Sequence, residues 1–248
     1  MKIHTAGPKT FSILLVTISL IPFVASAQKR RPPAGGRVAI VADERLSALR
    51  TAPELSARLL RRLGRGRFVA ISGEARSRDG VVFYRVNVTT RTRGWLQREA
   101  VVSINKTGDD QRLMSLIEAS EDFDLIARGR IFLDSFPHSA LRPAVLLLFG
   151  KTAEAAAGKL SRDAGRRLKD EEMIAGRAPE FSYFMNYNGL DRYNRQGIRF
   201  VFDAFEKKFH YDGATWREIV RRYPHSLEAS EALERLEGLR LINQYRPR

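Results

Sequence analysis

The stretch between residues 82 and 88 places the strongest limit on what this chain can fold into. Its residues alternate so that four apolar side chains share one face of an extended segment, namely Val82, Tyr84, Val86 and Val88. A period of two residues is typical of a β-strand with one buried face. Asp79-Gly80 stands just before this stretch and favours a hairpin turn. We therefore predict a strand here that follows a tight turn.

Other apolar runs around this stretch are equally short and are separated by glycine. Phe68-Val69-Ala70-Ile71 precedes it, after the turn sequence Gly64-Arg65-Gly66. Arg93-Gly94-Trp95-Leu96 and Ala100-Val101-Val102 follow it. Several short strands punctuated by glycine are expected of a small β-barrel. The sequence predicts such a barrel for residues 37–103.

The order of these features resembles the bacterial SH3-like domain. That family has an early leucine, an Arg-x-Gly-Pro turn, a strand that carries leucines, an aromatic strand and a late Gly-Trp pair. The matching positions here are Leu46 or Leu49, Arg50-Thr51-Ala52-Pro53, Leu59 to Leu63, Tyr84 to Val86, and Gly94-Trp95. The chain departs from the family at Ala52, where glycine is usual, and at Phe83-Tyr84, where tryptophan is usual. The resemblance implies a small barrel.

Tyr84 and Trp95 are the aromatic candidates for a ligand groove on this barrel. A barrel of this size needs its large side chains inside, so we expect both rings to pack in the core. A surface groove lined by the two rings is the alternative.

Positive charge is concentrated in the same part of the chain. The whole sequence carries a net charge of +15, and residues 28–100 hold 17 Lys and Arg against 6 Asp and Glu. Such a surface attracts polymers that bear phosphate or carboxylate groups, which arginine can bind through two hydrogen bonds. A general preference of the genome for arginine is an alternative explanation. The predicted ligand-binding residues are Arg50, Arg61, Arg62, Arg65, Arg67, Tyr84 and Trp95.

The amino-terminal segment 1–27 has the pattern of a secretory signal peptide. Lys2 and Lys9 flank a polar opening, and residues 11–25 are almost wholly apolar. Ala25-Ser26-Ala27 then forms a cleavage sequence. The apolar run is shorter than the ~20 residues that span a membrane. We expect a periplasmic or secreted protein that has no membrane span after removal of this segment, and export argues against a nucleic-acid ligand. Residues 28–36 are expected to form a flexible basic leader.

Beyond Ser103 the apolar spacing becomes helical. Asp109-Asp110 can begin the first helix, and residues 109–245 are expected to form an all-α domain that is separable from the barrel near 103–108. The predicted helical segments are 113–117, 123–132, 141–157, 198–209, 216–223 and 227–241, with Ala229, Ala232, Leu233 and Leu236 on the inner face of the last. Residues 159–177 are expected to form an exposed helix or a mobile connection.

Two similar turns occur in this half. Phe136-Pro137-His138-Ser139 and Tyr223-Pro224-His225-Ser226 each place a proline that ends one helix before a serine that can cap the next. The pattern resembles the helix pairs of tetratricopeptide-like proteins, especially envelope lipoproteins that assist outer-membrane assembly. The chain departs from that family in the spacing of its two turns, and it has no lipid-modified cysteine. The resemblance implies an α+β protein whose SH3-like barrel is followed by tetratricopeptide-like helices that bind a protein partner.

Catalytic motifs are missing from the sequence after residue 27. The histidines there, His138, His210 and His225, form no metal-binding spacing, and the chain has no cysteine, so neither a disulfide nor a cofactor is predicted. We expect a non-catalytic exported envelope protein that binds cell-wall or other anionic material. The alternative is a secreted hydrolase, or a hydrolase accessory, with its active residues in the aromatic segment 183–193. A deep pocket with convergent polar groups would favour the hydrolase.

Overall fold

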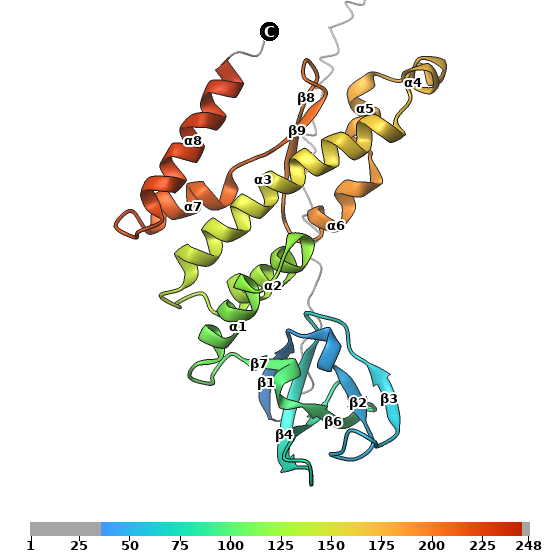
Figure 1. Ribbon diagram of the computed structural model, residues 1–248, viewed down its shortest axis with the longest axis vertical. Helices are drawn as coiled ribbons and strands as arrows, with labels where there is room; N and C mark the ends of the chain where they lie inside the picture. Colours follow the sequence, from blue (N-terminus) through green and yellow to red (C-terminus); the bar gives the residue numbers. More distant parts are fainter. Residues whose placement is uncertain (1–35, 245–248) are drawn as a thin grey trace, which may run out of the picture. The chain divides into compact units, whose positions relative to one another are not determined.

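A computed structural model describes residues 36–244 of the chain (Figure 1). The predicted signal peptide and the leader up to residue 35 lie outside the described residues. In the described part, no helix is both long and apolar enough to cross a membrane.

The first half is a seven-stranded antiparallel sheet. The strands are β1 (Arg37–Val41), β2 (Ala48–Arg50), β3 (Leu59–Arg62), β4 (Phe68–Arg76), β5 (Val82–Asn87), β6 (Arg93–Gln97) and β7 (Val101–Ser103), in the spatial order β3-β2-β6-β5-β4-β1-β7. Short 3-10 helices, η1 (Glu44–Leu46) and η2 (Arg98–Ala100), connect some of them. The turn between β4 and β5 contains Gly80 at φ 80°, a left-handed conformation that suits glycine.

The alternation along β5 is confirmed. Tyr84, Val86 and Val88 are each exposed by 4% or less and lie in one apolar core with residues of β1, β4 and β6. Their cross-strand partners on β6 follow the same alternation, because Leu96 lies opposite Tyr84 and is fully buried. Trp95 therefore points to the opposite face of the sheet, and the expectation that its ring packs in the core is wrong.

The sheet does not close into the predicted barrel. Closure would require the edge strands β3 and β7 to pair, and they do not. The polar backbone groups of β7 instead bind the first helix, α1 (Asp109–Glu118). Asp109 accepts a 2.7 Å hydrogen bond from the amide of Ser103, and Arg112 donates to the carbonyls of Val101 and Glu99. These contacts occupy the edge that a closed barrel would need.

The second half consists mainly of helices arranged around α3 (Figure 1). They are α2 (Asp122–Ser135), α3 (Arg142–Arg167), α4 (Asp170–Gly176), α5 (Glu180–Met185), η3 (Asn188–Leu190), α6 (Asp191–Asn194), α7 (Ala214–Arg222) and α8 (Ala229–Gln244). The predicted helix 141–157 is the start of α3, which continues to Arg167 and packs against α2 and α7. On α8, Ala232 is buried as expected, whereas Leu233 is 46% exposed.

The prediction of an all-α second half is wrong at residues 198–209. These residues form much of a β-hairpin, β8 (Phe200–Asp203) with β9 (Lys208–Tyr211). Phe200, Phe209 and Tyr211 are buried against α3, and Val201 on the other face is 38% exposed. This is an alternation of period two in aromatic and β-branched residues, which favour strands.

The two similar turns lie between helices, as predicted, but their serines differ. The Ser139 hydroxyl accepts a hydrogen bond from the amide of Leu141 and donates one to Asp110 at 2.8 Å. The Ser226 hydroxyl is buried without a hydrogen-bond partner among the described residues. Only the first serine therefore supports the start of the next helix.

The sheet and the helices share a core. Strand pattern gives way to helix pattern between residues 103 and 109, as predicted, but Ile40, Ala42 and Val102 of the sheet pack in one cluster with side chains of α1, α2 and α3. Contacts within the described chain place both halves in one compact unit. The two halves therefore share buried apolar surface, and their separation near residues 103–108 stays a prediction.

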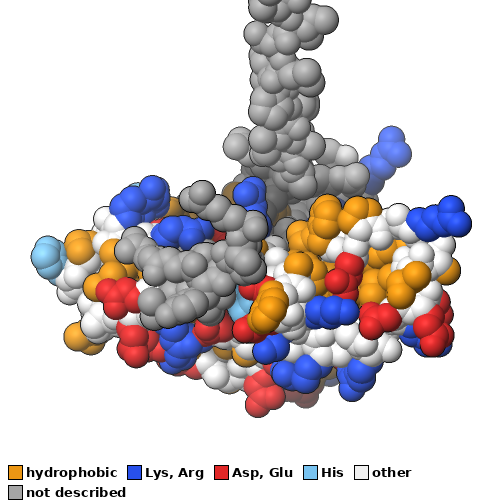
Figure 2. All heavy atoms as spheres, turned by 90° about the horizontal axis from the view of Figure 1, so that it is seen from above, with side chains coloured by type: hydrophobic (Ala, Val, Ile, Leu, Met, Phe, Trp, Pro, Cys, Tyr) orange, Lys and Arg blue, Asp and Glu red, His pale blue; other side chains and the backbone are white. Residues whose placement is uncertain are grey.

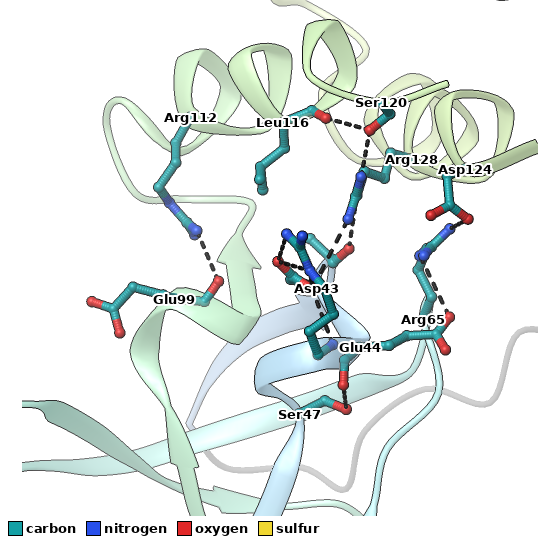
Figure 3. Close-up of polar contacts among 12 residues, drawn as sticks. Asp43, Glu44, Ser47, Arg65, Glu99, Arg112, Leu116, Ser120, Asp124 and Arg128 are labelled. Atoms are coloured by element: carbon teal, nitrogen blue, oxygen red, sulfur yellow. Dashed lines mark hydrogen bonds and ion pairs between the residues drawn. The ribbon is translucent and has the colours of Figure 1, made fainter. Parts of the chain in front are cut away.

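A polar contact reinforces this shared core (Figure 3). Arg128 of α2 is 5% exposed, and its guanidinium donates to the carbonyl of Ala42 at 3.4 Å and to the hydroxyl of Ser120. It also lies 3.9 Å from the Asp43 carboxylate. A buried charge is costly without such partners, so these contacts fix how α2 meets the sheet.

Candidate functional site

The outer face of the sheet carries a row formed by Arg50, Trp95 and Arg85. Trp95 on β6 lies directly opposite Arg50 on β2 and directly opposite Arg85 on β5. Residues opposite one another in an antiparallel sheet project from the same face, with Cβ atoms about 4.5–5.5 Å apart. The indole of Trp95 is half-buried and Arg85 is exposed. We call these three residues the arginine–tryptophan row.

The row continues in both directions along the same face. Leu59 of β3 lies opposite Arg50 and is 46% exposed, and Gly73 of β4 lies opposite Arg85. Arg93 stands two residues before Trp95 on β6, so it projects from this face as well and is exposed. At Phe83 this face is not accessible to solvent, because the Phe83 side chain is fully buried. Its open part therefore lies around Arg85 and Arg93.

Most arginines of the sheet half have no carboxylate partner within residues 36–244. Of the 14 arginines between residues 37 and 103, only Arg45, Arg65 and Arg98 form ion pairs within the described part of the chain. In the helical half, basic side chains commonly face carboxylates, as in Lys207–Glu180 at 2.6 Å and Arg142–Glu218 at 3.0 Å. Exposed arginines of the sheet half without an ion pair to a described residue are Arg37, Arg58, Arg61, Arg62, Arg76, Arg78, Arg85, Arg91 and Arg93.

Two of the predicted site residues do not face an open surface. Tyr84 is 3% exposed in the core of the sheet, and its hydroxyl accepts a hydrogen bond from Lys106 at 3.4 Å. Its place in the core confirms the packing expected of this ring. Arg65 is bound to Asp124 at 2.9 Å and to Glu44 at 3.4 Å, and its side chain is only 14% exposed. Both residues therefore serve the fold.

The remaining predicted residues are available at the surface to different degrees. Arg61 and Arg62 are exposed on the edge strand β3, and Arg67 is half-buried after the turn that follows this strand. The guanidinium of Arg50, a member of the row, donates a 2.7 Å hydrogen bond to the carbonyl of Ala57, which restricts its position. Arg85 was missed by the sequence reasoning. Its outward position between the buried residues Tyr84 and Val86 was the signal that could have revealed it.

The charges at the junction of sheet and helices are compensated. Asp43 accepts hydrogen bonds from the side chain and the amide of Arg45, and these bonds, together with the nearby charge of Arg128, hold the pKa of its carboxyl below the ordinary value. The hydrogen bond from Arg65 likewise lowers the pKa of Asp124. These carboxylates stay ionised at neutral pH and neutralise the arginines beside them.

The exposed histidines and the acidic residues 170–172 lie on different elements of the helical half. His138 and His225 are exposed in their turns, and Asp170, Glu171 and Glu172 are exposed on α4. Within residues 36–244, no group of three His, Cys, Asp or Glu side chains is arranged to hold a metal ion.

The aromatic segment 183–193 contributes mostly to the core around α3. Phe184, Tyr187 and Tyr193 are each at most 8% exposed, and the Tyr183 hydroxyl donates to the carbonyl of Met173 at 3.2 Å. A cavity of about 560 Å³ lies elsewhere, between residues 104–110 and the turn 135–139. The residues proposed for a hydrolase thus mainly hold the helices together.

The helical half carries an apolar surface around α4, α5 and the β8–β9 turn. Its members are Phe205 at 87%, Ile174 at 76%, Phe181 at 56% and Met185 at 45% exposure. Figure 2, which shows the face seen from above Figure 1, has apolar side chains gathered beside Lys, Arg, Asp and Glu side chains. Lys207 pairs with Glu180 at 2.6 Å and with Asp170 at 3.5 Å, so the turn is tied to α4 and α5.

In comparisons with known proteins, no family model, no curated protein and no solved structure matches this chain.

Proposed function

We propose that this protein is a non-catalytic, exported envelope protein whose sheet half binds cell-wall or other anionic polymers. The observation that carries the proposal is the set of exposed arginines that lack carboxylate partners among the described residues, gathered on the sheet and around Trp95. An unpaired exposed guanidinium keeps its donors available for phosphate or carboxylate, whereas a paired one does not. The proposal includes export through residues 1–27 and a periplasmic or secreted location.

The first test compares unpaired with paired arginines in the chain from Gln28 onward. Replacing Arg61, Arg62 and Arg85 by glutamine should weaken co-sedimentation with purified cell-wall material about tenfold, a change of about 1.4 kcal/mol. Wild-type binding should fall steeply with salt, because exposed charges are screened over ~10 Å at ~0.1 M.

The matched control removes the same number of charges from the helices. Arg130, Arg166 and Arg222 each face a carboxylate, so replacing these three by glutamine should change binding less than twofold. Equal losses in both triple variants would show that only net charge matters. No binding to any anionic polymer at low salt would remove the proposed function of the sheet.

We propose further that the helical half binds a protein partner through Phe205, Ile174, Phe181 and Met185. Large apolar side chains rarely gather on a surface without such a role, and aromatic residues and methionine are enriched in protein interfaces. The ion pairs of Lys207 support this, because they connect the turn that carries Phe205 to α4 and α5. The surrounding charges of both signs suit a partner with an apolar centre and a polar rim.

Site-specific photocrosslinking in the producing cells tests this surface. A crosslinker at position 205 should give one adduct with an envelope protein, and Ile174→Glu should abolish it because a charge would enter the contact. The control position is Leu227, which is 95% exposed outside this surface. The same adducts at positions 205 and 227, or adducts that persist with Ile174→Glu, would contradict the proposal.

The hydrolase or hydrolase accessory was the alternative from the sequence. Its predicted active segment supplies core side chains, and the 560 Å³ cavity is lined by other residues. We therefore favour the binding function.

A further inference from the structure

We infer that the arginine–tryptophan row binds a carboxylated polysaccharide, with a sugar ring against Trp95 and carboxylates at Arg50 and Arg85. The inference rests on the proposed binding of anionic polymers and names the polymer. The inference predicts that the row binds carboxylated pyranose chains more tightly than anionic chains that have no sugar rings.

The geometry of the row sets the spacing of the ligand groups. Arg50, Trp95 and Arg85 belong to three adjacent strands and are direct partners across them. Neighbouring strands lie about 4.8 Å apart, so the two arginine backbones stand about 10 Å apart with the indole midway. A chain that crosses the strands would therefore meet a cation, a flat apolar ring and a second cation in turn.

The chemistry of the three side chains selects the ligand. The face of an indole is flat and apolar, and the C–H face of a pyranose ring has a matching shape, so the two can pack while the sugar hydroxyls stay in water. A guanidinium binds a carboxylate through two parallel hydrogen bonds. A polyphosphate or an acidic peptide satisfies the arginines but presents no such ring to Trp95.

Local contacts prepare the row for binding. The hydrogen bond from Arg50 to the carbonyl of Ala57, at 2.7 Å, restricts one guanidinium before a ligand arrives. Beyond Arg85, the position opposite on β4 is Gly73, where an added Cβ would lie 3.7 Å from the Arg85 Cβ. The missing side chain leaves the row open on that side. A ligand chain can therefore extend past Arg85 along the strand direction or across β4.

The test uses four probes of matched length on the chain from Gln28 onward. Polygalacturonate has both carboxylates and pyranose rings, whereas polyglutamate has carboxylates without such rings. Polyphosphate has phosphate groups without sugar rings, and dextran has pyranose rings without charge. We expect polygalacturonate to bind at least tenfold more tightly than polyglutamate or polyphosphate, and dextran to bind weakest. Tryptophan fluorescence should report the binding through Trp95, since the other tryptophan, Trp216, is fully buried.

Variants then separate the ring from the charges. Trp95→Leu should weaken polygalacturonate binding about tenfold and leave polyglutamate binding unchanged, whereas Arg85→Gln should weaken both. Arg222→Gln is the control, because Arg222 is exposed on α7, outside the sheet, and pairs with Glu218 at 3.6 Å. Circular dichroism confirms the fold, and Trp95→Phe, which keeps an aromatic ring, should recover part of the affinity.

Each outcome decides between the two proposals. Equal binding of polygalacturonate and polyglutamate, or an unchanged affinity in Trp95→Leu, would overturn this inference while leaving the binding of anionic polymers in place. Failure of all three anionic probes to bind would overturn both.

Discussion

Replacing Arg128 by alanine is expected to lower the free energy of unfolding by about 3 kcal/mol, because removal of one member of a buried charged network leaves its partners unsatisfied. The carbonyl of Ala42 would lose a donor, Ser120 would lose one hydrogen-bond partner, and Asp43 would keep only Arg45. The cavity left by the side chain adds to this cost. Urea unfolding of the full chain, followed by circular dichroism, measures the difference.

Arg65 provides the matched control because it also joins the sheet to α2. Its partners Asp124 and Glu44 are more than half exposed, and exposed ion pairs contribute about 0–1 kcal/mol. Arg65→Ala should therefore cost at most about 1 kcal/mol. A cost for Arg128→Ala no greater than that for Arg65→Ala would contradict the role assigned to the buried contact. Two separate unfolding transitions in the wild-type chain would contradict the shared core.

Replacing Gly150 by alanine is expected to destabilise the protein by about 1–2 kcal/mol, although alanine favours a helix. Gly150 lies in α3 where α7 crosses it, and an added Cβ would come within 3.0 Å of Trp216 Nε1 and Thr215 Oγ1. Overpacking of a rigid core costs about 1–3 kcal/mol, which exceeds the gain of about 1 kcal/mol from alanine in a helix. Trp216 is fully buried and has little room to move.

Gly165 on the same helix is the matched control. A Cβ there would meet no atom within 4 Å, so Gly165→Ala should stabilise the protein by about 0.5–1 kcal/mol. Thermal or urea unfolding of both variants measures the change in the free energy of unfolding, which should have opposite signs in the two variants. A stabilising effect of Gly150→Ala would show that α7 does not pack closely on α3.

The candidate site could be predicted only in part. The excess of arginine in the first half is a property of composition, and the sequence located it. The orientation of Trp95 could also have been predicted from alternation along residues 93–96. Leu96 faces the core, so its neighbour Trp95 faces the other side of the sheet. The row itself was not predictable from one strand, because it depends on which strands become neighbours: β6 pairs with β2 across a sequence separation of more than forty residues. Arg65 was misjudged because its partner Asp124 lies in another half of the chain.

Local patterns by themselves determined the strands near 68–71, 82–88, 93–96 and 100–102, the turn at Asp79-Gly80 and the position where strands give way to helices. These features depend on side-chain periodicity and on the backbone preferences of single residues. Tertiary contacts decided the rest. Whether the sheet closed depended on α1, which bound the edge of β7. Residues 200–211 became a hairpin because α3 offered a surface that buried Phe200, Phe209 and Tyr211 together. Burial against a distant element outweighs local preference, and a sequence does not show which elements will meet.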